Sequence, residues 1–447
     1  MTIISSSSSW LRGFSFGFWV LAFGFSAHAD SVTLPLQGYY HPGRYMPVRV
    51  IGEPAGGKPS GIMIRGDETV SCTLNSRTGE KIDALVPVMP IGAQTSQLHW
   101  AWLEQPGHYI TPPLHPLSDR ERLVGYAGVS SVDAAAITRE IYPDCDPIRE
   151  KLNPAQPLPG MPACWEALDV IATDAPTMQR IDEQHVSSLL GAGVAFAVKA
   201  EKPPLPHWPW KRASHGWWTL SYVPAGPAAA TYNAQAYAPL IGMAEGWPPA
   251  MRRRYLFEGC GFVVVMLLLA LWRPRYILFM GIFVTGAVAF TMLYWHQWER
   301  PLRIVEGKVR IITPEMTQDD DWAFFIAPER NFSRSRWVNT MKLVLPKPGM
   351  VGAMDPRIEC FSNGDPDALA FNILPHERAA VLCRRCGPQA SSISPNPIKP
   401  SPLERLVKDL YLSPADSIVG QLPASPLISE SYFPLEQWPA IVVRRGK

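Results

Sequence analysis

Charged residues are scarce in this sequence, and their signs nearly cancel. They make up 18% of the 447 residues, and the formal net charge is only +2. The proportion of charge is low for a purely soluble protein of this length. So small a net charge also creates no overall field that would recruit nucleic acid. We therefore expect no nucleic acid among the partners of this protein.

Proline and tryptophan, in contrast, are frequent, with 46 and 16 copies. Proline fixes φ and lacks an amide hydrogen, so it interrupts both helices and the interiors of sheets. This composition favours short strands joined by rigid turns over long soluble helices. The length of the chain is sufficient for two or three domains.

The N-terminus has the layout of a secretory signal peptide. Arg12 precedes an apolar stretch over residues 14–25, and a small-x-small site follows at Ala27–Ala29. One cation, an apolar core and such a site are typical of exported precursors. We predict a signal peptide over residues 1–29 with cleavage before Asp30. An uncleaved anchor is the alternative, and in both cases the next segment is exported.

Two long apolar runs follow, at Tyr255–Trp272 and Tyr276–Trp295. At the rise of an α-helix they would span about 27 and 30 Å, close to a bilayer core of about 30 Å. Aromatic residues cluster at the ends of both runs, as they do at headgroup depth. We predict a transmembrane hairpin with its turn at Arg273–Arg275. A buried hairpin in a soluble core is the alternative.

The signal peptide and the hairpin together define the expected location. If the segment before the hairpin is exported, the turn is cytoplasmic and the segment after the hairpin is exported again. We therefore expect an inner-membrane protein with both soluble parts on the periplasmic side. The positive-inside rule alone favours the reverse orientation, because five arginines flank the hairpin and only two lie in its turn. Long domains, however, translocate largely regardless of their charge.

The two outer soluble parts have the pattern of β proteins. Residues 30–115 contain short alternating segments between glycine, proline and asparagine turns, which predicts a small antiparallel β-sandwich. Residues 301–447 predict a mainly-β C-terminal domain with one amphipathic helix at Pro402–Leu412. Near its start we expect two short strands around Glu306–Lys308.

Residues 116–250 have a different pattern, in which strands alternate with helices. Leu168–Thr173 is an expected buried strand, Asp182 can cap a helix through Leu190, and Val194–Val198 is the next expected strand. A strand, a helix and a strand within about thirty residues make a βαβ unit. Such a unit requires a parallel sheet, so we predict an α/β domain here.

The segments LDVIATD, DEQHVSSLL and GAGVAFAV in this part resemble class I glutamine amidotransferase-like domains. The resemblance covers residues 120–200, and it implies a bacterial membrane protein that combines a β-sandwich, this α/β domain and transmembrane helices. Active members carry a nucleophilic cysteine in a Gly-x-Cys-x-Gly elbow. Cys145 and Cys164 lack the flanking glycines, and Cys260 lies in the first apolar run. The resemblance therefore implies a non-catalytic relative.

Ser130 is the one candidate nucleophile in a suitable local sequence. Gly128-Val129-Ser130 follows a predicted strand and opens a predicted helix, where α/β hydrolases place their serine. Val132 occupies the position of the second glycine of that elbow, and no base partner is identifiable. The alternative is that Ser130 or Ser131 caps the helix.

Cys383 and Cys386 have the C-x-x-C spacing of redox dithiols, half-zinc sites and haem attachment. Haem attachment requires a histidine next, where Gly387 stands. Cys360 and His376 would complete a set of three cysteines and a histidine for zinc. A local disulfide that includes Cys360 and free thiols are the alternatives.

Three further groups are candidates for polar or partner contacts. Asp319–Asp321 could bind a hard cation, but lacks the spacing of a calcium loop and is better explained as a solvated turn. His185 is expected on the helix of the βαβ unit, at or near its surface. Four tryptophans form a dense aromatic patch that could bind a partner or simply pack: Trp208, Trp210, Trp217 and Trp218.

These observations favour a non-enzymatic envelope membrane protein that presents exported binding modules, as one subunit of a membrane assembly. The expected partners are the membrane and other envelope proteins, with no cofactor. One alternative is a membrane-anchored hydrolase or amidotransferase-like enzyme that uses Ser130. A second is a metal or redox sensor that uses Cys360, Cys383 and Cys386.

Overall fold

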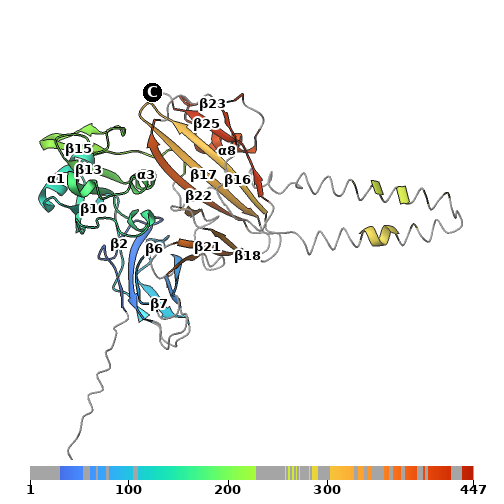
Figure 1. The fold of residues 1–447 in the computed structure, drawn as a ribbon, viewed down its shortest axis with the longest axis horizontal. Helices are drawn as coiled ribbons and strands as arrows, with labels where there is room; N and C mark the ends of the chain where they lie inside the picture. The colour runs from blue at the N-terminus through green and yellow to red at the C-terminus, as the bar shows by residue number, and fades with distance from the viewer. Residues whose placement is uncertain are drawn as a thin grey trace, which may run out of the picture.

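The fold is that of a computed structural model, which describes part of the chain. Described are residues 31–53, 61–66, 69–76, 80–103, 109–227, 303–326, 331–336, 341–344, 357–361, 366–373, 378–389, 396–397, 401–423 and 435–445, with isolated residues between 257 and 289. The predicted signal peptide lies outside these residues. Three large β-sheets and one two-stranded sheet, of β2 (Tyr39–Tyr40) with β9 (His115–Pro116), make up the described fold (Figure 1).

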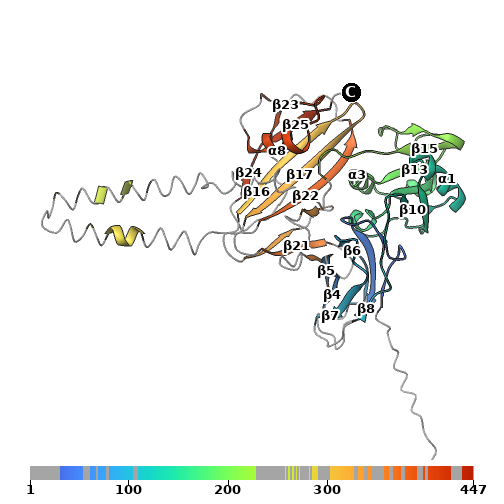
Figure 2. The same cartoon turned by 180° about the vertical axis from the view of Figure 1, so that it is seen from behind.

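The N-terminal sheet has the order β1-β3-β6-β5-β20-β21-β18, and β4, β7 and β8 branch from β5. Its strands are β1 (Ser31–Thr33), β3 (Met46–Gly52), β4 (Gly61–Gly66), β5 (Thr69–Asn75), β6 (Ile82–Pro90), β7 (Leu98–Trp102), β8 (Tyr109–Ile110), β18 (Asn331–Arg336), β20 (Arg357–Phe361) and β21 (Pro366–Ile373). Three of these strands come from the C-terminal part of the sequence. β20 pairs in parallel with β5, so that Ile358 lies opposite Cys72. Figure 2 shows β21 close to the N-terminal strands, with β20 between β21 and β5 in the sheet order.

The second sheet, which we call the mixed sheet, has the order β11-β10-β12-β13-β15-β14. Its strands are β10 (Glu121–Ala127), β11 (Asp146–Lys151), β12 (Val170–Asp174), β13 (Ala195–Lys199), β14 (Lys211–Arg212) and β15 (Trp217–Leu220). The first four strands pair in parallel, whereas β15 pairs antiparallel with both β13 and β14. After β13 the chain returns without a crossover helix, which is why β15 runs in the opposite direction.

Two short helices pack on the mixed sheet. α1 (Ser131–Ile141) buries Ala134 and Ile137 against Val124 and Val170 of the sheet. α3 (Glu183–Gly191) begins at the N-cap Asp182, whose side chain accepts the N–H of Gln184 at 2.9 Å. α3 lies between the mixed sheet and the third sheet (Figure 1). It therefore connects two units that are distant in sequence.

The C-terminal sheet has the order β19-β22-β17-β16-β25-β23, with β24 beside β16. Its strands are β16 (Arg303–Ile312), β17 (Met316–Ile326), β19 (Met341–Val344), β22 (Arg378–Pro388), β23 (Ser417–Leu422), β24 (Leu435–Gln437) and β25 (Ala440–Arg444). One face of the sheet is covered by α8 (Pro402–Leu410), which buries Leu403, Leu406 and Val407 against Trp322 and Val309. This helix begins at Ser401, whose hydroxyl accepts the N–H of Leu403.

β16 corrects the expectation of two short strands around Glu306–Lys308. The strand is continuous through Gly307, which lies opposite Trp322 of β17. A Cβ on Gly307 would lie 2.5 Å from a methyl carbon of Leu403. The glycine therefore provides room for α8 to approach the sheet and does not form a turn.

The fold class expected from the sequence is wrong. The described residues form mostly β-strands, in sheets that are rich in antiparallel pairs, with only short helices. Residues 116–227 accordingly contain a mixed sheet, where a parallel α/β domain was expected. Strands of the expected C-terminal domain also join the N-terminal sheet, through backbone pairing that local patterns do not encode.

The predicted transmembrane hairpin is contradicted as well. Across the residues that the structure describes, every helix is too short or too polar to cross a bilayer. Most of Tyr255–Trp272 and Tyr276–Trp295 lies outside those residues. The expected inner-membrane location, with both soluble parts exported, stays a prediction.

Candidate functional site

Ser130 lies just beyond the carboxyl end of β10, where it is the N-cap of α1. Its hydroxyl oxygen accepts the N–H of Asp133 at 3.1 Å. Asp133 in turn forms an ion pair with Lys199, at 3.1 Å. Within the described part of the chain, no histidine forms a hydrogen bond with Ser130. The serine therefore has a structural role, and among the described residues no base is hydrogen-bonded to it.

The turn that precedes Ser130 packs closely against Asp174. Gly128 has a φ of +72°, and a Cβ at this position would lie 2.3 Å from Oδ1 of Asp174. That oxygen accepts the N–H of Thr177 at 3.0 Å and caps α2 (Ala175–Met178). The polar groups at the carboxyl ends of β10 and β12 thus cap helices or pair with one another.

Cys383 and Cys386 do not form a dithiol site. Both lie on β22, where residues three apart project from opposite faces and are separated by about 10 Å. A disulfide requires Cα atoms within about 7 Å. Cys360 lies on β20 in the N-terminal sheet, and His376 lies outside the described residues. No disulfide links any of the seven cysteines, all of which the structure describes.

Three of the cysteines are also poor nucleophiles and metal ligands. Burial raises the pKa of the Cys145, Cys164 and Cys386 thiols, which keeps them protonated. A thiol must ionise before it attacks a substrate or binds a metal. In the described residues, no three His, Cys, Asp or Glu side chains gather in a way that could hold a metal ion.

Asp319–Asp321 lies within strand β17, and this corrects the expectation of a solvated turn. The three carboxylates alternate between the two faces of the C-terminal sheet. On one face, Asp319 accepts two hydrogen bonds from Arg310, each of 2.6 Å. Asp321 on the same face pairs with Arg385 at 2.8 Å and with Lys308 at 3.3 Å.

On the other face, Asp320 is the centre of a buried polar group that we call the Asp320 cluster. The cluster contains Gln318, Asp320, Trp322, Arg384 and Tyr411. Arg384 donates to both carboxylate oxygens of Asp320, at 2.8 and 2.7 Å. The Tyr411 hydroxyl donates to Asp320 at 2.7 Å, and Gln318 donates to it at 2.8 Å. The carboxylate is fully buried, so these four hydrogen bonds replace its water shell.

The aromatic patch is largely internal. Trp208 and Trp217 are buried, and the indole N–H of Trp208 donates to Glu183 at 2.8 Å. The indole N–H of Trp218 donates to the carbonyl oxygen of Ala200. These contacts support packing over partner binding. His185 is also half-buried, where burial lowers its pKa and its Nε2 lies 3.0 Å from the carbonyl oxygen of Gly160.

A second polar cluster, which the sequence patterns do not indicate, joins the N-terminal sheet to the mixed sheet. Asp169 Oδ2 lies 2.7 Å from Nε2 of His41 and accepts the N–H of Leu123 at 2.9 Å. Arg44 donates to Oδ1 at 3.3 Å. Burial raises the pKa of Asp169, but His41 and Arg44 outweigh this effect, and the pKa is lowered. Only the spacing of His41 and Arg44 around a Pro-Gly turn could have suggested this site.

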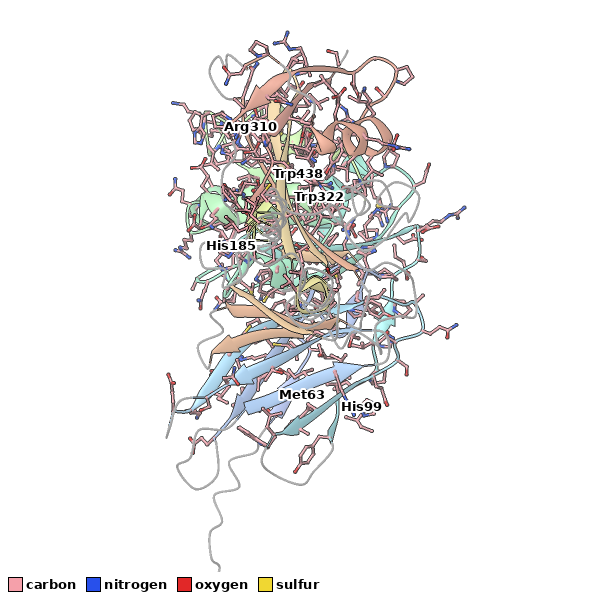
Figure 3. All side chains as sticks on the ribbon, turned by 90° about the vertical axis from the view of Figure 1, so that its right-hand side faces the viewer. Met63, His99, His185, Arg310, Trp322 and Trp438 are labelled. Atoms are coloured by element: carbon pink, nitrogen blue, oxygen red, sulfur yellow. The ribbon has the colours of Figure 1, made fainter. Side chains whose placement is uncertain are left out.

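Three exposed apolar side chains lie at the end of β7 and on β8. Leu103, Tyr109 and Ile110, which we call the apolar edge, are 51%, 49% and 55% exposed. The Tyr109 ring stacks on Trp100 with centroids 4.3 Å apart. Arg65 of β4, His99 of β7 and Ile110 of β8 lie opposite one another across the strands. They form one cross-strand row on the face that points away from Trp100 and Tyr109. His99 and Met63 lie together, far from Trp322 and Trp438 (Figure 3).

Comparison of the chain with protein-family models, with curated proteins and with solved structures gives no match. The resemblance to class I glutamine amidotransferase-like domains is therefore neither supported nor contradicted by relatives, and it stays a prediction.

Proposed function

We propose that this protein is a non-enzymatic binding protein that contacts another protein through the apolar edge and the adjoining row of Arg65, His99 and Ile110. The observation that carries the proposal is that the candidate nucleophiles are held in structural roles or buried. Ser130 caps a helix, and the thiols of Cys145, Cys164 and Cys386 are buried with a raised pKa. Side chains that are committed to the fold in this way do not support catalysis.

The apolar edge has the properties of a contact surface. β8 is the last strand of its branch in the described sheet, so its outer backbone groups can pair with an added strand. Tyr109 and Ile110 present large apolar side chains on the two faces of that strand. An aromatic ring that is already stacked, as Tyr109 is on Trp100, loses little conformational freedom on binding.

The charges beside the edge indicate the chemistry of the partner. Arg65 and His99 lie directly opposite each other on β4 and β7, and both side chains are exposed. Two basic side chains in a cross-strand pair repel when both are charged. A carboxylate between them would remove that repulsion. We therefore propose an extended segment with acidic and apolar side chains as the occupant.

Substitution at the apolar edge tests this proposal. Proteins captured by the wild-type chain and by the Ile110→Asp variant are compared by quantitative mass spectrometry. The control is Val132→Asp, because Val132 is a 70% exposed apolar residue on α1, away from β8. The proposal expects a partner that Ile110→Asp loses by at least tenfold and Val132→Asp retains. Equal capture by all three chains would refute it.

A further inference from the structure

Arg384 makes contacts with three parts of the fold at once. Its guanidinium group binds Asp320 of β17 and also donates to the carbonyl oxygen of Pro227, at 3.2 Å. Its own carbonyl oxygen packs against α3, where a Cβ on Gly191 would lie only 2.8 Å away. β22 therefore contacts both α3, which packs on the mixed sheet, and Pro227, which follows the mixed sheet in the sequence.

Residues 225–227 are held tightly at this point. The side-chain amide of Gln318 donates to the carbonyl oxygen of Ala225 and accepts its N–H, both at 2.9 Å. Gly226 has a φ of +85°, and a Cβ there would lie 2.4 Å from the ring of Tyr411. The segment thus fits between β17 and the end of α8 without room for a side chain.

Tyr411 extends the same contacts to α8, which it follows directly. Its hydroxyl donates to Asp320 and accepts the indole N–H of Trp322, each at 2.7 Å. Burial and the neighbouring Asp320 charge raise the pKa of Tyr411 well above its ordinary value. The hydroxyl therefore keeps the proton that it donates.

We propose that Arg384 and the Asp320 cluster couple the position of residues 225–227 to α8 and α3. The chain leaves the described fold at Pro227 and returns at Arg303, the first residue of β16, which pairs with β17. A displacement at Pro227 changes the contacts of Arg384, and through Arg384 it reaches α3 and α8. The position of residues 225–227 and the packing of α3 and α8 therefore change together.

Hydrogen exchange with the full-length chain tests the coupling. Arg384→Lys keeps the positive charge but loses the forked geometry that reaches both Asp320 and Pro227. The matched control is Arg385→Lys, because Arg385 is adjacent but pairs with Asp321 on the other face. For Arg384→Lys we expect exchange to rise about tenfold in three peptides, which cover residues 183–191, 217–227 and 402–411. For Arg385→Lys we expect no change in these peptides.

A second variant keeps the test decisive if Arg384→Lys does not fold. Gly226→Ala pushes residues 225–227 away from Tyr411 without touching Arg384. It is expected to raise exchange in residues 402–411 and, through Arg384, in residues 183–191. Faster exchange confined to residues 217–227 would overturn the proposal. The same exchange pattern in Arg385→Lys as in Arg384→Lys would overturn it as well.

Discussion

The buried pair of Asp320 and Arg384 provides the sharpest test of the energetics of this fold. Arg384→Met removes the positive charge and leaves a carboxylate that is 0% exposed without a counter-charge. Breaking one side of such a pair costs about 3–5 kcal/mol, because the remaining charge is still desolvated. Tyr411 and Gln318 still donate to Asp320, so we expect a loss near 3 kcal/mol, the lower end of that range.

A double variant separates the cost of the stranded charge from the loss of packing. Asp320→Asn combined with Arg384→Met leaves no charge in the Asp320 cluster and keeps an acceptor for Tyr411. We expect this chain to be more stable than Arg384→Met alone by about 1–3 kcal/mol. The control is Arg385→Met, whose side chain is 40% exposed. It should cost at most about 1 kcal/mol.

The assay is urea denaturation, followed by circular dichroism, of the wild-type chain and these variants. The midpoints and slopes give the change in the free energy of unfolding. Two results would refute the reasoning. One is a loss below about 1 kcal/mol for Arg384→Met. The other is a double variant that is no more stable than Arg384→Met.

Three further predictions follow from local geometry. Gly128→Ala places a Cβ 2.3 Å from the Asp174 carboxylate at a φ of +72°, so we expect a loss of about 2 kcal/mol or more in urea denaturation. Ser130→Ala removes a helix cap and should cost about 1 kcal/mol in the same assay, with the partner capture of the wild type retained. The lowered pKa of Asp169 stabilises the fold above the ordinary carboxyl pKa of about 3.9, and this contribution is lost as the pH falls through the lower folded value. Asp169→Asn should therefore flatten the pH dependence of the unfolding free energy below pH 5, and an unchanged acid profile would contradict this.

Local elements of this fold follow well from the sequence. Asp182 was expected to begin a helix, and it is the N-cap of α3. The amphipathic pattern after Pro402 predicted α8, within two residues of its end. Capping and hydrophobic periodicity depend on neighbours along the chain, so one sequence contains the whole signal.

Pairing between distant segments could not be predicted in this way. β20 joins β5 although Ile358 and Cys72 are far apart in sequence. A run of three aspartates is typically solvated. Here the cations that neutralise it come from β16 and β22, and Arg384 is 64 residues from Asp320. The close packing of Gly307 against Leu403 likewise joins two segments that are distant in sequence. Such contacts decide whether a polar run is a turn or a buried strand.

The apolar edge was missed for a related reason. Tyr109 and Ile110 resemble ordinary strand residues in the sequence, and their exposure goes with the position of β8 at the end of its branch. The tryptophan patch shows the opposite case. Its density left partner binding and plain packing both open, and the fold buries Trp208 and Trp217. Exposure is a property of the tertiary arrangement and not of composition.

The most direct test of a binding role is the reactivity of Ser130 in the native protein. The folded chain is treated with a fluorophosphonate, which modifies activated serines, and the modified sites are mapped by mass spectrometry. We expect no modification at Ser130, because its hydroxyl caps α1 and no histidine is placed to activate it in the described residues. Stoichiometric modification of Ser130 that disappears on denaturation would contradict the account and show that the site is catalytic.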